Sequence, residues 1–174
     1  DWLYKIVAKL HLRRRPSKDK LSRMRAPDEI VAWAYRQMND LDVSVRDKGN
    51  ALQYRNALFI AILVNCPMRL RNLTMIRIGK HLQQTGDCYR LDFVPDEVKT
   101  NRYLSLHLPA VLTSFMANWI TEWRPLLEAA ISSDALWISI RGAPLRDRGV
   151  YNGVVETTEA AFGAPINPHL FRDI

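Results

Sequence analysis

The sequence has few cysteines, no long apolar run and no glycine-rich phosphate loop. Cys66 and Cys88 are its only cysteines among 174 residues, too few for a disulfide framework or a thiolate zinc site. The longest apolar run, residues 57–64, is far shorter than the roughly 20 residues that span a bilayer, and the first residues do not resemble a signal peptide. Common nucleotide-binding loops are excluded as well. These absences predict a soluble protein of a reducing cytosol.

What the sequence has in excess is positive charge. Its 25 Lys+Arg against 18 Asp+Glu give a net charge of +7, which favours a polyanionic partner or an anionic surface. Hydrophobic residues make up 48% of the chain. That content and length suit one globular domain with a sizeable core, and are too small for several domains.

The first 25 residues differ from the rest. Apolar residues recur at helical spacing over residues 2–10, which predicts the closing turns of a helix from a preceding, core-binding-type domain. Residues 11–25 form a basic linker broken by Pro16, which we expect to be either a solvated tether or a segment along a phosphate backbone. Its candidate DNA-binding residues are Arg13, Arg14, Arg15, Lys18, Lys20, Arg23 and Arg25. Residues 26–174 are predicted to form the main domain.

Helical periodicity dominates this main domain. Apolar spacing predicts helices over residues 27–39, 51–65, 112–123 and 146–162, with a short helix after Pro125. The helix over 51–65 is nearly all apolar in its second half, so we expect it to be buried. Gly163 is expected to end the helix over 146–162.

Three short antiparallel strands are predicted between the second and third of these helices. Residues 75–78 are β-prone, and apolar residues alternate with polar ones over 89–93 and 104–108. The predicted connections are residues 79–86 and 95–102, and the second contains Lys99. The predicted fold class is therefore mainly α with a small three-stranded antiparallel β-sheet, an α+β arrangement.

Cationic residues stand at several special places in this pattern. Arg69 follows the buried helix directly, where a charge must find a partner. Asn167 is a good N-cap and Pro168 fits the first helical position, so His169 and Arg172 would share one face of a helix start that favours anions. A surface histidine and arginine would give the same short pattern. The pair therefore gains meaning only from the rest of the chain.

The order of these features resembles the catalytic domain of the tyrosine recombinases, also called the phage integrase family. Residues 68–73, Met-Arg-Leu-Arg-Asn-Leu, are similar to the first arginine box of that family. Residues 98–100, Val-Lys-Thr, are similar to its hairpin lysine, and residues 168–172, Pro-His-Leu-Phe-Arg, to its second box. A Gly-Ala-Pro-Leu turn at 142–145 stands between them. The resemblance covers residues 26–174 and implies site-specific DNA recombination through a 3′-phosphotyrosine intermediate.

The resemblance also implies a role for each cation. Arg69 and Arg172 would hold the non-bridging oxygens of the scissile phosphate, and His169 would hydrogen-bond the same group. Lys99 would protonate the leaving 5′-hydroxyl. Arginine is planar and permanently charged, whereas lysine can give up a proton, so the residue types suit these roles. Preorganised cations can stabilise the phosphate charge alone, so no metal and no cofactor are expected.

Two of these assignments keep alternatives. Arg71 could replace Arg69 as the box arginine, although only Arg69 keeps the box in the register of the family. Lys99 has Lys80 and Arg102 as neighbours, and a hairpin lysine can simply be exposed to solvent. Of the four assignments, that of Lys99 therefore has the least support from the sequence.

The chain departs from the family pattern in two ways. The first is Asn72, which stands where the family usually carries an acidic residue that supports the site. The second is the position of the tyrosines. His81 and His107 are not part of the pattern, and we interpret them as ordinary loop and strand residues. All six tyrosines precede the second box, and the chain has no initiator methionine. We therefore expect a C-terminally truncated piece of a longer protein, inactive by itself, with the nucleophilic tyrosine beyond Ile174.

The partner implied by the resemblance is double-stranded DNA. The full-length protein would assemble as a homotetramer on DNA, without a small-molecule cofactor or a membrane. It would be bacterial or phage-encoded, cytoplasmic, and associated with the nucleoid when bound. A type IB topoisomerase is one alternative, since it shares much of this chemistry. A non-catalytic DNA-binding module that lacks the nucleophile is another.

Overall fold

The computed structural model describes residues 2, 4, 25–41, 44–45, 47–127 and 132–172. The predicted helix over 2–10, apart from residues 2 and 4, and the basic linker, apart from Arg25, lie outside the described residues. So do residues 128–131 of the short helix predicted after Pro125. The elements, in chain order and with η for 3-10 or π turns, are α2 (Pro27–Asp40), α3 (Lys48–Asn65), α4 (Leu70–Thr74), β1 (Leu82–Thr85), β2 (Cys88–Phe93), η2 (Pro95–Glu97), β3 (Leu104–His107), α5 (Val111–Asn118), η3 (Trp119–Trp123), η4 (Arg124–Leu126), α6 (Asp147–Phe162) and η6 (Leu170–Arg172).

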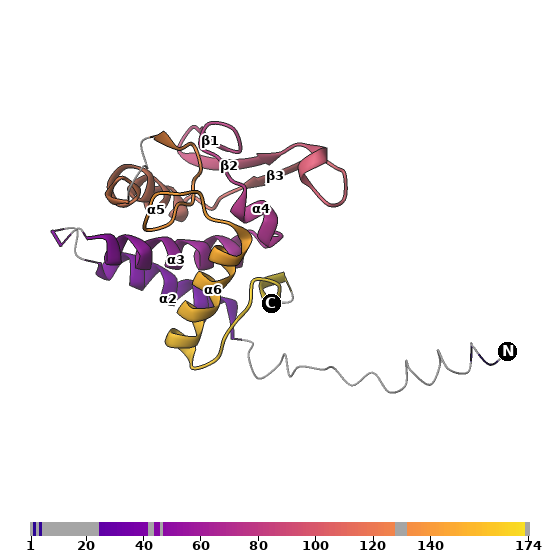
Figure 1. Cartoon of the computed structure of the whole chain (residues 1–174), viewed down its shortest axis with the longest axis horizontal. Helices are drawn as coiled ribbons and strands as arrows, with labels where there is room; N and C mark the ends of the chain where they lie inside the picture. The colour runs from indigo at the N-terminus through magenta and orange to yellow at the C-terminus, as the bar shows by residue number, and fades with distance from the viewer. Residues whose placement is uncertain are drawn as a thin grey trace.

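Helix α3 is the centre of the fold. Every side chain from Ala57 to Leu63 is fully buried, which confirms the burial predicted from its apolar second half. The sheet and α5 lie on one side of α3 and α2 lies on the other (Figure 1). The Asp47 carboxylate caps the start of the helix by accepting the Asn50 N–H at 2.7 Å. The helix ends just before Pro67, which lacks the N–H to continue it.

The sheet confirms the predicted fold class but corrects its first strand. The strand order is β1-β2-β3, with both pairs antiparallel. Strand β1 lies inside the stretch 79–86, where we predicted a connection. Its sequence Leu-Gln-Gln-Thr has a single buried residue, Leu82, so no alternation marks it and backbone pairing at the sheet edge holds it instead.

Residues 75–78, predicted as the first strand, form only single bridges. Arg77 pairs with Ala135, and the Ile78 N–H donates to the Asp134 carbonyl at 2.8 Å. The β-prone character of this stretch thus serves a pairing with a segment far along the chain. No local pattern in the sequence could show that pairing.

The helix predicted over residues 112–123 is present but changes its winding. It is α-helical as α5 and continues as a π-helical turn, η3. Trp119 and Trp123 in this turn are both buried, and the Trp119 indole N–H donates to the Leu136 carbonyl at 3.1 Å. The aromatic residues of this helix therefore belong to the core.

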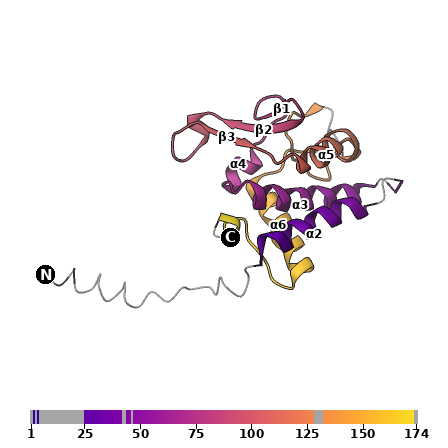
Figure 2. The ribbon, with the colours of Figure 1, turned by 180° about the vertical axis from the view of Figure 1, so that it is seen from behind.

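Helix α6 packs closely on α3 and leads to the C-terminal turn. A Cβ on buried Gly153 would lie only 2.9 Å from the Asn56 side-chain oxygen, so glycine permits this approach. The Asn56 amide group donates to the Thr157 hydroxyl at 3.2 Å. Gly163 ends the helix with a φ of 71°, as predicted. The C-terminal turn, drawn in yellow, lies beside α6 (Figure 1, Figure 2).

No helix in the described part of the chain combines the length and the apolar character needed to cross a membrane. The same residues contain no group of three His, Cys, Asp or Glu side chains that could hold a metal ion.

Candidate functional site

Arg69 lies at the start of the short helix α4. Pro67 stops α3, and Arg69 has an extended backbone (φ −70°, ψ 145°) before α4 begins. Within α4, Leu73 is fully buried, and its carbonyl accepts the indole N–H of Trp137 at 2.8 Å. This bond fixes the orientation of α4, so that Arg69 is half-buried and Arg71 is exposed.

A pocket of about 240 Å³ joins Arg69 to the connection between β2 and β3. The structure therefore brings together Arg69 and Lys99, which the sequence could only place in order along the chain. Arg71 borders the same pocket, so the choice between Arg69 and Arg71 stays a prediction. The lining residues are Arg69, Arg71, Asn72, Asp96, Glu97, Val98 and Lys99.

Lys99 lies in that connection, residues 94–103, as predicted. Its neighbour Val98 is 8% exposed and anchors the connection in the core, whereas Lys99 itself is exposed. Asn101 then turns the chain with a φ of 51°, in the left-handed region that asparagine tolerates better than most residues. The turn thus presents Lys99 beside the pocket.

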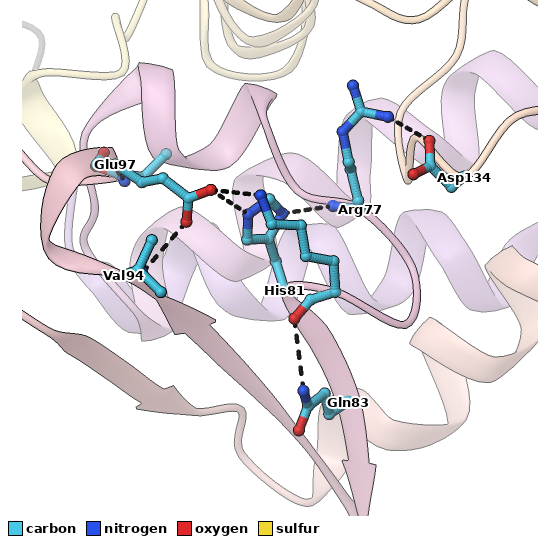
Figure 3. Close-up of polar contacts among 8 residues, drawn as sticks. Arg77, His81, Gln83, Val94, Glu97 and Asp134 are labelled. Atoms are coloured by element: carbon cyan, nitrogen blue, oxygen red, sulfur yellow. Dashed lines mark hydrogen bonds and ion pairs between the residues drawn. The ribbon is translucent and has the colours of Figure 1, made fainter.

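Glu97 borders the pocket but its carboxylate is occupied by other donors. One oxygen accepts the Lys80 ammonium at 2.6 Å and the His81 Nε2 at 3.1 Å (Figure 3). The other accepts the Val94 N–H at 3.2 Å. The hydrogen bond from Lys80, followed by that from His81, lowers the pKa of Glu97 to about 2. This carboxylate is therefore charged and already paired.

His81 contacts Glu97, which lines the pocket, and the sequence did not reveal this contact. The sequence predicts an ordinary loop residue, but the His81 side chain is only 2% exposed and lies between two partners. Its Nδ1 accepts the Arg77 backbone N–H at 3.0 Å, and its Nε2 faces Glu97. The only possible signal was a histidine beside a lysine in a loop, and such a pair is common.

The C-terminal turn carries His169 and Arg172. The Asn167 side-chain oxygen accepts the backbone N–H groups of His169 (3.0 Å) and Leu170 (3.3 Å), which confirms the predicted cap. The described part of the turn is 3-10 rather than α-helical, and residues three apart in such a turn lie one above the other. Leu170 and Phe171 are buried, so His169 and Arg172 are both left exposed.

Buried contacts hold this turn against α6. Thr158 is fully buried, and its hydroxyl oxygen accepts the Ile166 N–H at 2.9 Å. The same hydroxyl donates to the Val154 carbonyl at 2.8 Å. His169 and Arg172 are not among the residues that line the Arg69 pocket. Their convergence with Arg69 on one phosphate therefore stays a prediction.

The candidate cations share one property. Within the described residues, the side chains of Arg69, Lys99 and Arg172 form no hydrogen bond or ion pair. Their donors are therefore available for an external anion. Asp96 and Glu97 also line the pocket, but no acid among the described residues pairs with Arg69 or Lys99. Unpaired arginine and lysine side chains are well suited to phosphate oxygens.

Arg25 is the one residue of the predicted DNA-binding group that the structure describes. Its guanidinium donates to the Phe162 carbonyl at 3.1 Å, at the end of α6. Arg25 therefore has a structural contact of its own. Arg13, Arg14, Arg15, Lys18, Lys20 and Arg23 lie outside the described residues.

Two other arginines are buried and bind inside the chain. Arg55 is 7% exposed and donates to the Ile138 carbonyl at 2.7 Å and to the Asn56 side-chain oxygen at 2.9 Å. Burial lowers the pKa of Arg55 to about 10. Arg124 is 6% exposed and donates twice to the Ala135 carbonyl, at 3.2 and 2.8 Å.

Comparison with known proteins identifies the family of this chain. The model of the phage integrase family matches residues 35–174. The chain therefore belongs to the phage integrase family, the same family that its motifs resemble. No curated protein sequence is significantly similar.

Solved structures of the XerH site-specific recombinase have a similar fold. The pre-cleavage complex with its difH substrate is 21% identical with a TM-score of 0.58, over 83% of this chain and 39% of that one. The post-cleavage complex with palindromic difH is 21% identical with a TM-score of 0.59, over 86% and 40%. The chain thus spans about two fifths of the length of these structures.

Proposed function

We propose that this protein contributes the phosphate-binding side of a site-specific DNA recombinase, which cuts a DNA strand and rejoins it to another. The observation that carries the proposal is that Arg69 and Lys99 line one pocket and that their charged groups bind none of the described residues. Membership of the phage integrase family supports it. So does the fold, which is shared with recombinases in complex with DNA.

Each cation then has a distinct task. Arg69 and Arg172 bind the non-bridging oxygens of the scissile phosphate, and His169 donates a hydrogen bond to the same group. These donors stabilise the negative charge that grows on the phosphate during attack. The exposure of His169 and Arg172 on one side of the C-terminal turn is consistent with this task.

The covalent step exchanges one phosphate ester for another. A tyrosine hydroxyl oxygen attacks the phosphorus and loses its proton to solvent, forming a 3′-phosphotyrosine bond. The bond between phosphorus and the 5′ oxygen breaks, and its electron pair stays on that oxygen, which takes a proton from the Lys99 ammonium. Rejoining is the reverse reaction with a second 5′-hydroxyl. Since one ester bond replaces another, no external energy source is needed.

The attacking hydroxyl comes from outside the pocket described above. No tyrosine of the described residues lines it. Tyr54 is 2% exposed and donates to the Phe115 carbonyl at 3.0 Å, so it belongs to the core. We propose that the nucleophile is a tyrosine outside this pocket, in the same subunit or in a second subunit of a tetramer on DNA. In the bacterial or phage-infected cell, such a protein would work at the nucleoid.

The test uses the complete product of the gene with a supercoiled plasmid that carries two copies of the DNA flanking that gene. We expect a covalent protein–DNA adduct that survives denaturation in SDS, together with recombination between the two copies. Relaxation without recombination would indicate a topoisomerase instead. DNA binding without any adduct would indicate a non-catalytic module.

A further inference from the structure

A partly buried hydrogen bond connects the two sides of the Arg69 pocket. Asn72 is 2% exposed, and its side-chain amide donates to the Glu97 backbone carbonyl at 3.1 Å. Asn72 is three residues after Arg69 on α4, and Glu97 is two residues before Lys99. The bond therefore runs between the element that carries the arginine and the connection that carries the lysine.

The Glu97 side chain fixes the same connection from a second direction. Its carboxylate holds the Val94 N–H at 3.2 Å, which closes the turn that opens the connection. It also binds Lys80 and His81, which precede β1. Hydrogen bonds to an ionised carboxylate are stronger than those between neutral groups. Glu97 is thus tied by its backbone to α4 and by its side chain to the start of the sheet.

His81 is itself held in one orientation. Because its Nδ1 accepts the Arg77 N–H, its Nε2 carries the hydrogen and donates to Glu97 (Figure 3). The imidazole stacks on the Phe93 ring, with centroids 5.2 Å apart. The His81 carbonyl accepts the Asp92 N–H at 2.9 Å. The base of the connection therefore has little freedom to shift relative to β2.

We propose that Asn72, His81 and Glu97 form a positioning clamp, which holds the Lys99 connection against α4 so that the Lys99 ammonium reaches the leaving 5′ oxygen. The clamp rests on the proposed function, since it serves the proton transfer from Lys99. Its members are positioning residues, because their polar groups bind one another inside the fold. Misplacing a reacting group by about 1 Å can reduce a rate roughly 100-fold.

Asn72 has a specific chemical reason to be an amide. A carbonyl oxygen accepts hydrogen bonds and cannot donate them, so the group opposite the Glu97 carbonyl must carry a hydrogen. In an Asn72→Asp variant, a carboxylate oxygen would face that carbonyl and repel it. The acidic residue that the family usually has at this position would therefore disrupt this particular clamp.

A pair of DNA substrates separates positioning of Lys99 from a general structural role. In one substrate the scissile phosphate has its normal 5′ oxygen, and in the other a 5′ sulfur replaces that oxygen. A thiolate leaves without a proton, so the second substrate does not need Lys99. A Lys99→Ala variant calibrates the assay, because it should lose cleavage of the first substrate and recover with the second.

We expect Asn72→Asp in the complete gene product to cleave the normal substrate roughly 100-fold more slowly than wild type. On the sulfur substrate it should regain nearly the wild-type rate. Glu97→Gln should show the same pattern with a smaller loss, on the order of tenfold, because glutamine still accepts from His81 but without charge. Adding Asn72→Asp to Lys99→Ala should cause no further loss on either substrate.

Matched controls test whether position matters. Asn39→Asp makes the same change on the exposed end of α2, and Asp87→Asn removes an exposed carboxylate in the turn between β1 and β2. Both should cleave both substrates as wild type does. If Asn72→Asp does not fold, as judged by circular dichroism, Glu97→Gln and Lys99→Ala carry the comparison.

The outcomes separate the two proposals. Variants that are equally slow on both substrates, or as fast as wild type on the normal one, overturn the clamp while the proposed function stands. A wild-type protein that cleaves neither substrate overturns the proposed function and the clamp together.

Discussion

The molecule uses arginine in two contrasting ways. Arg55 and Arg124 are buried, and their donors are occupied by main-chain carbonyls and, for Arg55, also by the Asn56 side chain. Arg69 is half-buried at a pocket and Arg172 is exposed on a turn, and neither side chain binds another described residue. The difference shows that residue type alone does not indicate function. The free donors of Arg69 and Arg172 separate them from the buried pair and leave them available to an external anion.

The physical reason lies in the cost of burying a charge. A buried cation must be fully hydrogen-bonded, so Arg55 satisfies its donors with the Ile138 carbonyl and the Asn56 side chain, under the ring of Phe59. At the pocket, water can solvate Arg69 until an anion replaces it. The following predictions test this contrast, from the largest expected effect to the smallest.

Arg69→Ala should have the largest effect, and it should act on catalysis. Removing one donor to a charged intermediate costs about 3 to 4 kcal/mol of barrier, so we expect a roughly 100- to 1000-fold slower cleavage by the complete gene product. Because the Arg69 side chain forms no hydrogen bond or ion pair with the described residues, the denaturant midpoint should change little.

Arg71→Ala is the matched comparison, since Arg71 is exposed on the same helix and borders the same pocket. It should slow cleavage much less than Arg69→Ala. A larger loss in Arg71→Ala would assign the role in the first arginine box to Arg71.

Arg55→Met should act on stability. Methionine keeps much of the buried volume but leaves the Ile138 carbonyl without its donor, and an unsatisfied buried group costs about 1 to 3 kcal/mol. Urea denaturation should report this loss, whereas DNA affinity at low temperature should not change. Arg36→Met, an exposed arginine on α2, serves as the control and should stay within about 0.5 kcal/mol of wild type. An Arg55→Met protein as stable as wild type would show that this buried arginine does not support the fold, contrary to the contrast drawn above.

Because the Glu97 carboxylate is paired, we predict that its contribution to the stability of the fold depends on pH. Its pKa falls from 4.5 to about 2 in the folded protein, chiefly through the hydrogen bond from Lys80. A carboxylate with a lowered pKa stabilises the fold above its unfolded pKa and loses that contribution as the pH falls through its folded pKa.

The free energy of unfolding of wild type should therefore exceed that of Glu97→Gln by about 1 kcal/mol at neutral pH. The difference should shrink between pH 4.5 and about 2, over the interval set by the two pKa values. Urea titrations across this range measure it. A difference that is independent of pH would show that the Glu97 charge is not paired in solution.

Lys80→Met should have the smallest effect. The Lys80 side chain is 58% exposed, and exposed ion pairs contribute at most about 1 kcal/mol and commonly a few tenths. We expect Lys80→Met to lower the free energy of unfolding by a few tenths of a kcal/mol, and this difference from wild type should disappear at high salt. A loss larger than that of Arg55→Met would mean that partial exposure does not weaken this pair.

Local sequence patterns predicted the parts of the fold that local interactions determine. The burial of α3, the end of α6 at Gly163 and the cap by Asn167 all follow from neighbouring residues, and the structure has them. The sequence also placed Lys99 in the connection between two strands. These features need only a helical period, a glycine with positive φ or a side chain that reaches the adjacent backbone.

The features that the sequence did not reveal depend on distant residues. Strand β1 was missed because Leu82 is its only buried residue. The partners of His81 and Asn72 meet only after the sheet forms, since Glu97 lies far along the chain from both. Arg55 was not distinguished from other arginines, because its acceptor at Ile138 belongs to a separate segment.

The missing side chain at Gly153 lets α6, the helix that leads to the turn bearing Arg172, lie close to Asn56 on α3. Helix α6 contacts α3 at Gly153, where an added methyl group would lie 2.9 Å from the Asn56 side-chain oxygen. The hydrogen bond from the Ile166 N–H to the Thr158 hydroxyl connects this helix to the segment that leads into the turn bearing Arg172. A Gly153→Ala change would therefore test whether the spacing of α3 and α6 sets the position of Arg172 relative to Arg69, without altering either residue.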